Sequence, residues 1–197
     1  MLNVLRVIIH LGCGIPLVWL AFVLNSESEV FGADPTKDLE HFLGYTAIII
    51  FCIMFLLGIV LQLLNKNQYQ VLRRPLGLWA FAWALLHVAS YLVLELSLDV
   101  SLFFSELVQR PYLILGGIAF TILMVMAITS IPKVKTALGK KWFSVHQFAY
   151  PAIVLAAIHY YWSVKGVTLG PIVIGIMVTV IVLWKFTGHH IMHKLKA

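Results

Sequence analysis

The sequence predicts an all-α integral membrane protein, a bundle of six transmembrane helices of the kind that crosses a bacterial membrane. Of its 197 residues 61% are hydrophobic and 11% are charged, whereas a soluble domain carries about a quarter charged residues. Six apolar runs are long enough to cross a hydrocarbon layer of about 30 Å. The apolar alternation over about ten residues that marks barrel strands is absent. We therefore expect residues 1–197 to form a single transmembrane domain.

The predicted helices each have about 20 residues, the length that a helical span requires. They cover residues 4–24, 42–64, 75–96, 112–131, 142–162 and 169–186. The first run has a single basic residue, Arg6, near its start and no small-residue cleavage site after it. We therefore expect it to be a retained helix and not a removed signal peptide. Pro151 falls within the fifth run and is expected to bend that helix.

The distribution of lysine and arginine orients the predicted bundle. If the N-terminus is cytoplasmic, all of the 14 basic residues except Lys37, Arg110 and Lys165 fall in inner segments. The outer segments are acidic by contrast. The positive-inside rule therefore predicts that both termini are cytoplasmic. Topology accounts for the net charge of +6, so we do not expect nucleic acid as a partner.

The cysteines and the short connecting segments limit the chemistry that the chain can perform. Cys13 and Cys52 lie in apolar runs and form no CxxC, CxxCH or zinc-binding spacing, so neither a disulfide framework nor covalently attached haem is expected. No glycine-rich nucleotide-binding motif occurs. We expect no soluble catalytic domain, and any electron donor or final substrate must therefore be handled by partners.

Histidines are the main ionisable residues in the predicted spans, where such residues usually have a function. Carboxylates are almost absent from the spans, with Glu95 near one outer end, and this disfavours a proton pump or an ion transporter. Neutral imidazole is a common axial ligand of haem iron, and the core of a helix bundle is a common cofactor site. The candidate histidines are His10, His41, His87, His146 and His159.

Helix geometry separates these histidines by depth. His87 lies about 18 Å along the third helix and His159 near the outer end of the fifth, so the two can hold one haem in the outer half of the bundle. His146 lies about 20 Å from His159 along the helix axis, near the cytoplasmic face. Trp79 and Trp83 follow the same helical stripe as His87. Each histidine taken singly could instead be an interhelical hydrogen-bond partner.

Several motifs, in order and over nearly the whole chain, resemble those of a known family. They are RRPLGLWAFAW at 73–83 with His87 and Ser90-Tyr91, GADP at 32–35 with His41-Phe42 and Gly44, RPY at 110–112, LGK at 138–140 before His146, and IHY at 158–160 with WSVK at 162–165. The sequence resembles the MsrQ family, also called YedZ. This family of haem-binding membrane subunits belongs to the ferric-reductase-like transmembrane superfamily, with NADPH oxidases and STEAP reductases.

The resemblance implies a function in electron transfer. Members of the family carry haem b, with FMN as a further cofactor. They pass electrons from the quinone pool or a cytosolic flavin reductase across the inner membrane to MsrP, a periplasmic molybdenum enzyme. MsrP reduces methionine sulfoxide and so repairs oxidised periplasmic proteins. The chain would thus be an electron-transfer subunit of an oxidoreductase system and not a stand-alone catalyst.

The resemblance also implies an asymmetric set of ligands. Two-haem members of the superfamily carry one histidine pair in each leaflet, on the third and fifth helices. Here the outer pair, His87 and His159, is complete, whereas the inner pair has only His146. Arg73 stands 14 residues before His87, where an inner ligand would lie, and a guanidinium has no lone pair for iron. Together with Arg74 it suits a flavin phosphate or a haem propionate.

The inner leaflet is therefore expected to hold either FMN or a second haem. His10 lies on the inner side and is a candidate second ligand opposite His146. His41, at the outer edge, could hydrogen-bond a haem propionate, or it could cap or pack its helix. Two other classes stay open: a cofactor-free membrane anchor and a small transporter. Gly116-Gly117 is the nearest approach to the broken helix of a transporter, but it lacks charge.

Overall fold

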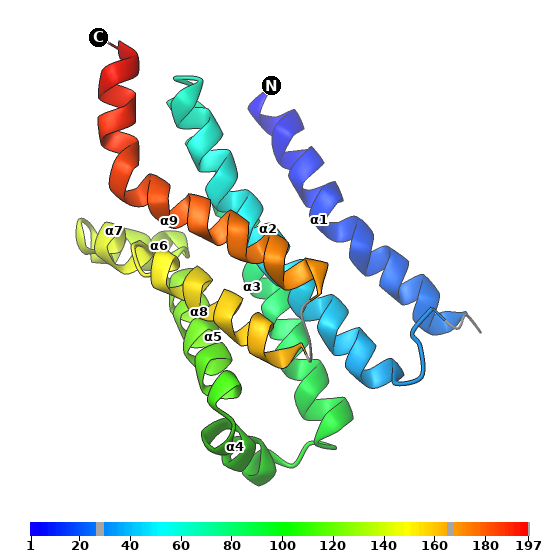
Figure 1. Ribbon diagram of the computed structural model, residues 1–197. Coiled ribbons are helices and arrows are strands. Elements are labelled where there is room, and N and C mark those ends of the chain that lie inside the picture. The colour runs from blue at the N-terminus through cyan, green and yellow to red at the C-terminus, as the bar shows by residue number, and fades with distance from the viewer. Residues whose placement is uncertain (27–29, 165–167, 197) are drawn as a thin grey trace.

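The computed structural model describes residues 1–26, 30–164 and 168–196, without the side chains of 189, 190 and 193–196. Every regular element in these residues is helical, so the prediction of an all-α protein is confirmed. Long helices lie side by side, and the two ends of the described chain lie at the same end of the bundle (Figure 1). Lys165, one of the three basic residues predicted to be outside, lies outside the described residues, as do the acidic residues Glu27 and Glu29 of the first outer segment.

The first half of the chain contains three long helical segments. Asp34 caps α2 by accepting a hydrogen bond from the Lys37 amide, and Pro35 occupies its first turn, where a missing N–H costs nothing. This cap starts the helix seven residues before the predicted boundary. The elements are α1 (Leu2–Asn25), α2 (Pro35–Leu63), the 3₁₀ helix η1 (Asn67–Leu72), α3 (Arg73–Ser90) and the π-helical turn η2 (Tyr91–Glu95).

The second half adds two short helices to the predicted ones, at α4 and α6. Asp99 caps α4 through the Leu102 amide, and Pro132 opens α6. The short helix α4 lies at the end of the bundle opposite the termini (Figure 1). The elements are α4 (Val100–Gln109), α5 (Pro111–Thr129), α6 (Pro132–Leu138), α7 (Lys141–His146), α8 (Ala149–Ser163) and α9 (Leu169–Lys196).

The single helix predicted over residues 142–162 is wrong, because the structure divides it into α7 and α8. Pro151 explains the division: it has no N–H to bond the carbonyl of Gln147, and its ring clashes with a continuing helix. That carbonyl accepts from the Tyr150 amide at 3.2 Å instead. The predicted bend at the proline is thus a complete interruption, at Gln147 and Phe148.

Five helical segments of the described chain are long and apolar enough to cross a membrane. They are Leu2–Asn25, Pro35–Leu63, Asn67–Glu95, Pro111–Thr129 and Leu169–Gly188. The 15 residues of α8 extend about 22 Å, which is less than the hydrocarbon thickness of about 30 Å. The structure therefore supports five of the six predicted spans by length and composition.

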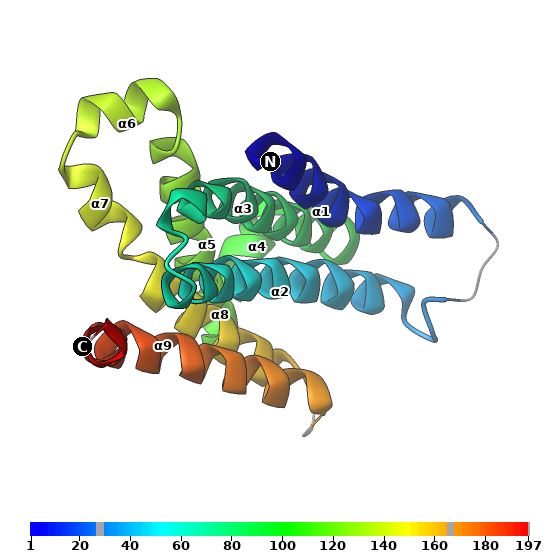
Figure 2. The ribbon, with the colours of Figure 1, turned by 90° about the horizontal axis from the view of Figure 1, so that it is seen from above.

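The core of the bundle lies around α2, which packs against α3, α8 and α9. In the apolar stretch of α2 that is long enough to cross a membrane, 50% of the residues are buried, whereas in that of α1 the share is 17%. The fully buried side chains include Phe51 and Cys52 of α2, Trp83 of α3 and Ile153 of α8. Seen from above, α1 lies at the edge of the bundle beside α3 (Figure 2). The well-packed centre thus brings α2, α3 and α8 together, and α3 and α8 carry the predicted histidine pair.

Candidate functional site

His87 of α3 and His159 of α8 face each other across the bundle. Their ring centroids lie 6.2 Å apart, with an angle of 65° between the ring planes. Imidazole nitrogen binds a metal ion such as zinc at about 2 Å, so two imidazoles on opposite sides of one ion have ring centres about 6 Å apart. The observed separation matches that geometry. The structure thus brings together the two residues that the sequence paired.

A backbone carbonyl of a neighbouring helix holds each of these rings. The Nδ1 atom of His87 lies 3.0 Å from the Glu40 carbonyl oxygen, and that of His159 lies 2.8 Å from the Tyr112 carbonyl oxygen. Because a carbonyl only accepts, Nδ1 carries the hydrogen in both rings and Nε2 keeps its lone pair. Metal-bound histidines commonly donate their other N–H in this way. Both rings therefore have the tautomer and the hydrogen-bond support that a histidine would need to bind a metal ion through Nε2.

A glycine makes room for each ring, four residues after the carbonyl that holds it. A Cβ atom on Gly44 would lie 3.2 Å from Cε1 and Nδ1 of His87. A Cβ atom on Gly116 would lie 2.8 Å from Nδ1 of His159, a separation at which neighbouring atoms overlap. The same arrangement of a carbonyl at position i and a glycine at i+4 is therefore built twice, on α2 and on α5.

Sequence reasoning missed the role of these glycines. Gly116 was weighed only as a sign of a broken helix, but α5 is continuous through it. Gly44 was quoted only as part of the family motif. The glycines themselves, each within the family motifs or a predicted helix, were the available signal for a close approach. The sequence does not show which histidine lies against each glycine, or that the carbonyl four residues earlier, of Glu40 or Tyr112, holds it.

Polar and aromatic groups surround His159 at the end of the bundle where α4 meets α5. The Tyr112 ring stacks on His159 with centroids 5.9 Å apart. Arg110 donates from Nη1 to the Tyr112 hydroxyl at 3.3 Å and pairs with Glu106. That hydrogen bond to Tyr112 is the main cause that raises the pKa of Arg110 above its ordinary value. Arg110 therefore holds the hydroxyl end of the tyrosine whose ring stacks on His159.

His41 also belongs to this end of the bundle. It follows Glu40, whose carbonyl holds His87, and it is partly buried. It is close enough to interact electrostatically with both His87 and His159. This position suits the predicted contact with an acidic group of a bound cofactor.

His146 does not join the pair. Its ring stacks on Trp142 with centroids 4.0 Å apart, and its Nε2 lies 3.2 Å from the Thr129 hydroxyl oxygen. That hydroxyl donates to carbonyls of its own helix, so it accepts from His146. The Nε2 atom is thereby engaged, and ligation through it requires this contact to break.

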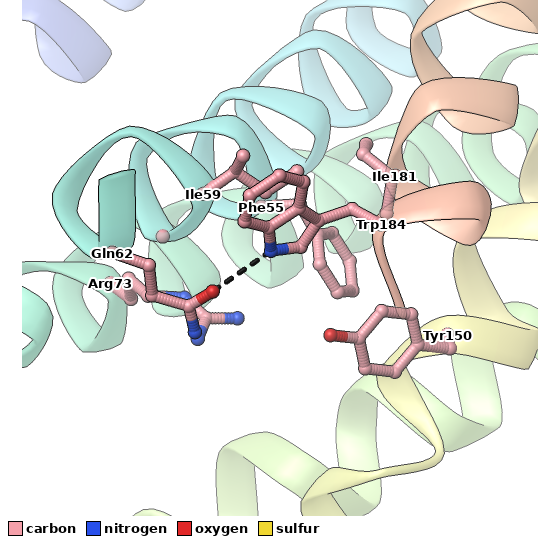
Figure 3. A pocket seen from close by; sticks show the side chains of 8 residues that line it. Phe55, Ile59, Gln62, Arg73, Tyr150, Ile181 and Trp184 are labelled. Atoms are coloured by element: carbon pink, nitrogen blue, oxygen red, sulfur yellow. Dashed lines mark hydrogen bonds between the residues drawn. The ribbon is translucent and has the colours of Figure 1, made fainter. Parts of the chain in front are cut away.

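Arg73 and Arg74 are adjacent in sequence but reach different pockets. Arg73 donates from Nε to the Met54 carbonyl at 3.3 Å and lines a pocket of about 20 Å³, which is space for about one water molecule. In Figure 3 the Arg73 guanidinium and the Tyr150 hydroxyl enter this pocket from opposite sides. Arg74 donates from Nη2 to the Ser130 carbonyl at 2.6 Å and lines a second pocket, of about 510 Å³.

The tryptophans of the predicted stripe connect α3 to α1. The Trp79 indole donates to Nδ1 of His10 at 2.9 Å, and that of Trp83 donates to the Cys13 carbonyl at 3.1 Å. His10 therefore has an indole as its partner. The structure does not bring it to His146.

Comparison with known proteins identifies the family of the chain. Residues 43–157, more than half of the chain, match the family described as ferric reductase like transmembrane component. The protein-methionine-sulfoxide reductase heme-binding subunit MsrQ of Pasteurella multocida is 55% identical over 169 residues, which cover 85% of this chain and 82% of the relative. The subunits of the same name from Cronobacter sakazakii and Klebsiella pneumoniae are 41% and 39% identical, over 92% of this chain and 90% of each relative. This chain is therefore a multi-pass bacterial membrane protein that belongs to the MsrQ group of the ferric-reductase-like transmembrane family.

Proposed function

We propose that this chain is a haem b subunit that carries electrons across the bacterial inner membrane to a periplasmic molybdenum-dependent methionine sulfoxide reductase of the MsrP type. One observation carries the proposal: the rings of His87 and His159 have centroids 6.2 Å apart, and a backbone carbonyl engages Nδ1 of each ring, so that Nε2 would be the ligand atom. The name of the relatives, heme-binding subunit, supports the same ligand. Acceptance of electrons by MsrP would support the repair of oxidised periplasmic proteins.

The residues of the chain would hold and tune the cofactor. The carbonyls of Glu40 and Tyr112 fix the orientation of the two imidazoles and increase their basicity. Gly44 and Gly116 let the rings approach their helices. A bound haem would supply a one-electron couple whose potential depends on these ligands, on burial and on the nearby Arg110 and His41.

The proposed topology has six crossings and cytoplasmic termini. Together, α7 and α8 would provide the sixth crossing, with the basic α6–α7 segment at the cytoplasmic face. His87 lies 14 residues after Arg73, about 21 Å along the helix, so the histidine pair would lie in the outer half. At this depth the pair would lie on the side of the proposed periplasmic acceptor.

The electron donor would be the quinone pool or a cytosolic flavin reductase, with FMN or a second haem in the inner leaflet. The pocket of Arg73 holds about 20 Å³, so a flavin there requires α2, α8 and α9 to separate. A second haem between His10 and His146 requires their contacts with Trp79 and Thr129 to break. We therefore propose one haem per chain, at His87 and His159.

Haem content of the purified protein tests the proposal. We expect a Soret band whose α-band sharpens on reduction, and one haem per chain by pyridine haemochrome. His87→Ala and His159→Ala should each abolish it, because each removes one of the two imidazoles that would hold the haem. His10→Ala is the matched control and should retain it. Absence of haem from the purified wild type would instead favour a cofactor-free anchor or a small transporter.

A further inference from the structure

A pocket of about 510 Å³ lies between α1 and α3, near the ends where both helices begin. Its volume falls in the range of ligand sites, about 300–1,000 Å³. One hydrogen bond joins two of its walls: the Trp79 indole donates to Nδ1 of His10 at 2.9 Å. The residues that line it are Arg6, His10, Val71, Arg74, Pro75, Leu78, Trp79 and Ala82.

The two arginines of this pocket lack an acidic partner. Neither Arg6 nor Arg74 forms an ion pair with a carboxylate in the described part of the chain, and none of the eight lining residues is acidic. All 8 acidic residues of the sequence lie in or beside the segments that join α1 to α2 and α3 to α5. Those segments are at the opposite ends of these helices, so none of the acidic side chains that the structure describes supplies a counter-charge at the pocket.

The remaining walls of the pocket are apolar. Val71, Pro75, Leu78 and Ala82 offer aliphatic surface along α3 and the segment before it. Leu78 and Val71 are exposed, at 38% and 43%, and α1 lies at an edge of the bundle (Figure 2). A ligand that fits must therefore combine an anionic head with an apolar body and enter from the side of the bundle.

We propose that this pocket binds an anionic phospholipid, with its phosphate between Arg6 and Arg74 and its acyl chain along Leu78 and Ala82. Guanidinium groups match phosphate oxygens in charge and in the geometry of their donors. Basic pockets between transmembrane helices are a recurrent site for anionic lipid heads. The Ser130 carbonyl fixes Arg74 through Nη2 and leaves its other nitrogens available to the phosphate.

The position of α1 gives this lipid a structural role. Only 17% of the membrane-length stretch of α1 is buried, the same share as for the segment that contains α3. The hydrogen bonds that join α1 to α3 are those from the two indoles to His10 and to the Cys13 carbonyl. A phosphate shared by Arg6 of α1 and Arg74 of α3 would add a third connection, at the end where the two helices begin. The lipid would thus attach α1 to the bundle independently of the histidine pair.

Lipid retention by the full-length, haem-loaded protein tests this site. Native mass spectrometry would compare added phosphatidylglycerol with phosphatidylcholine of the same acyl chains. We expect selective retention of phosphatidylglycerol, weakened about thirtyfold in the double variant Arg6→Gln, Arg74→Gln. The double variant Lys140→Gln, Lys141→Gln removes the same charge elsewhere and should retain the lipid. Equal retention in both double variants, or no preference between the lipids, overturns the proposal.

Two further arms separate the lipid from other phosphates and from misfolding. Glycerol 3-phosphate or FMN that competes with the lipid at equal concentration would show that the phosphate alone is recognised, and would overturn the lipid assignment. Leu78→Trp keeps both arginines but fills the pocket at an exposed position, so it should reduce lipid retention with an unchanged Soret band. Full retention in Leu78→Trp contradicts the proposed course of the acyl chain. Haem content reports separately on the proposed electron-transfer function.

Discussion

Gly116 lies so close to His159 that a Cβ atom on the glycine would stand 2.8 Å from Nδ1 of the imidazole. The same nitrogen donates to the carbonyl of Tyr112, one helical turn earlier on α5. One helix, α5, therefore both holds the ring by a hydrogen bond and leaves room for it at Gly116. On α2, Gly44 leaves room for the His87 ring and the Glu40 carbonyl accepts from its Nδ1.

Gly116→Ala should weaken haem binding without unfolding the bundle. The added methyl forces the His159 ring off its carbonyl, and overpacking of this kind costs about 1–3 kcal/mol, or roughly tenfold in haem retention. Haem content after extended dialysis against apomyoglobin measures the effect. Gly175→Ala is the matched control, because a Cβ there meets nothing within 4 Å. Equal haem loss in both variants would refute the steric role of Gly116.

His146→Ala should leave the haem at the outer pair in place. Among the described residues His146 contacts Trp142 and Thr129, not His87 or His159. We expect an unchanged haem count and reduced-minus-oxidised spectrum in this variant. A fall from two haems per chain to one would instead show that His146 holds a second haem, and complete haem loss would show that it ligates the outer one.

Trp83→Phe should loosen α1. Trp83 is fully buried, and its indole donates to the Cys13 carbonyl at 3.1 Å. The variant removes the hydrogen bond between the two helices, at a cost of about 0.5–1.5 kcal/mol, so the unfolding temperature in detergent should fall by a few degrees. Trp19→Phe changes a tryptophan that is 40% exposed and serves as the control. An equal decrease in both variants would argue against the role of the hydrogen bond.

The sequence predicts the fold because apolar length and charge distribution are local properties. The ends of the helices are predicted less well: the Asp34 cap advances α2, and Pro151 interrupts the fifth predicted helix instead of bending it. The amphipathic α4 escapes detection because its ten residues are too few for a span.

Part of the candidate site can likewise be predicted from the sequence, and part cannot. His87 and His159 can be paired from their depth, since rise per residue fixes depth along a helix. The carbonyls that hold the two rings cannot be predicted, because every residue has a backbone carbonyl and the identity of Glu40 or Tyr112 does not show that its carbonyl is the acceptor. The divergence of Arg73 from Arg74 is equally hidden: consecutive helical residues point about 100° apart, but which pocket each meets depends on the neighbouring helices.

Gly58 and Arg73 should prove energetically coupled. A Cβ atom on Gly58 would lie 2.9 Å from Nε of Arg73, whose guanidinium also bonds the Met54 carbonyl and lies 5.8 Å from the centre of the Phe55 ring. Gly58→Ala should therefore lower the unfolding temperature of the wild type, since the guanidinium must move from these partners.

In an Arg73→Gln background the shorter side chain removes that overlap. There, Gly58→Ala should be neutral or stabilising, because alanine favours a helix interior over glycine by about 0.5–1 kcal/mol. Thermal unfolding of the wild type, both single variants and the double variant measures this coupling. If Gly58→Ala has the same effect with and without Arg73, the close packing of the guanidinium against α2 is wrong, and the pocket of Arg73 is open enough for a larger ligand.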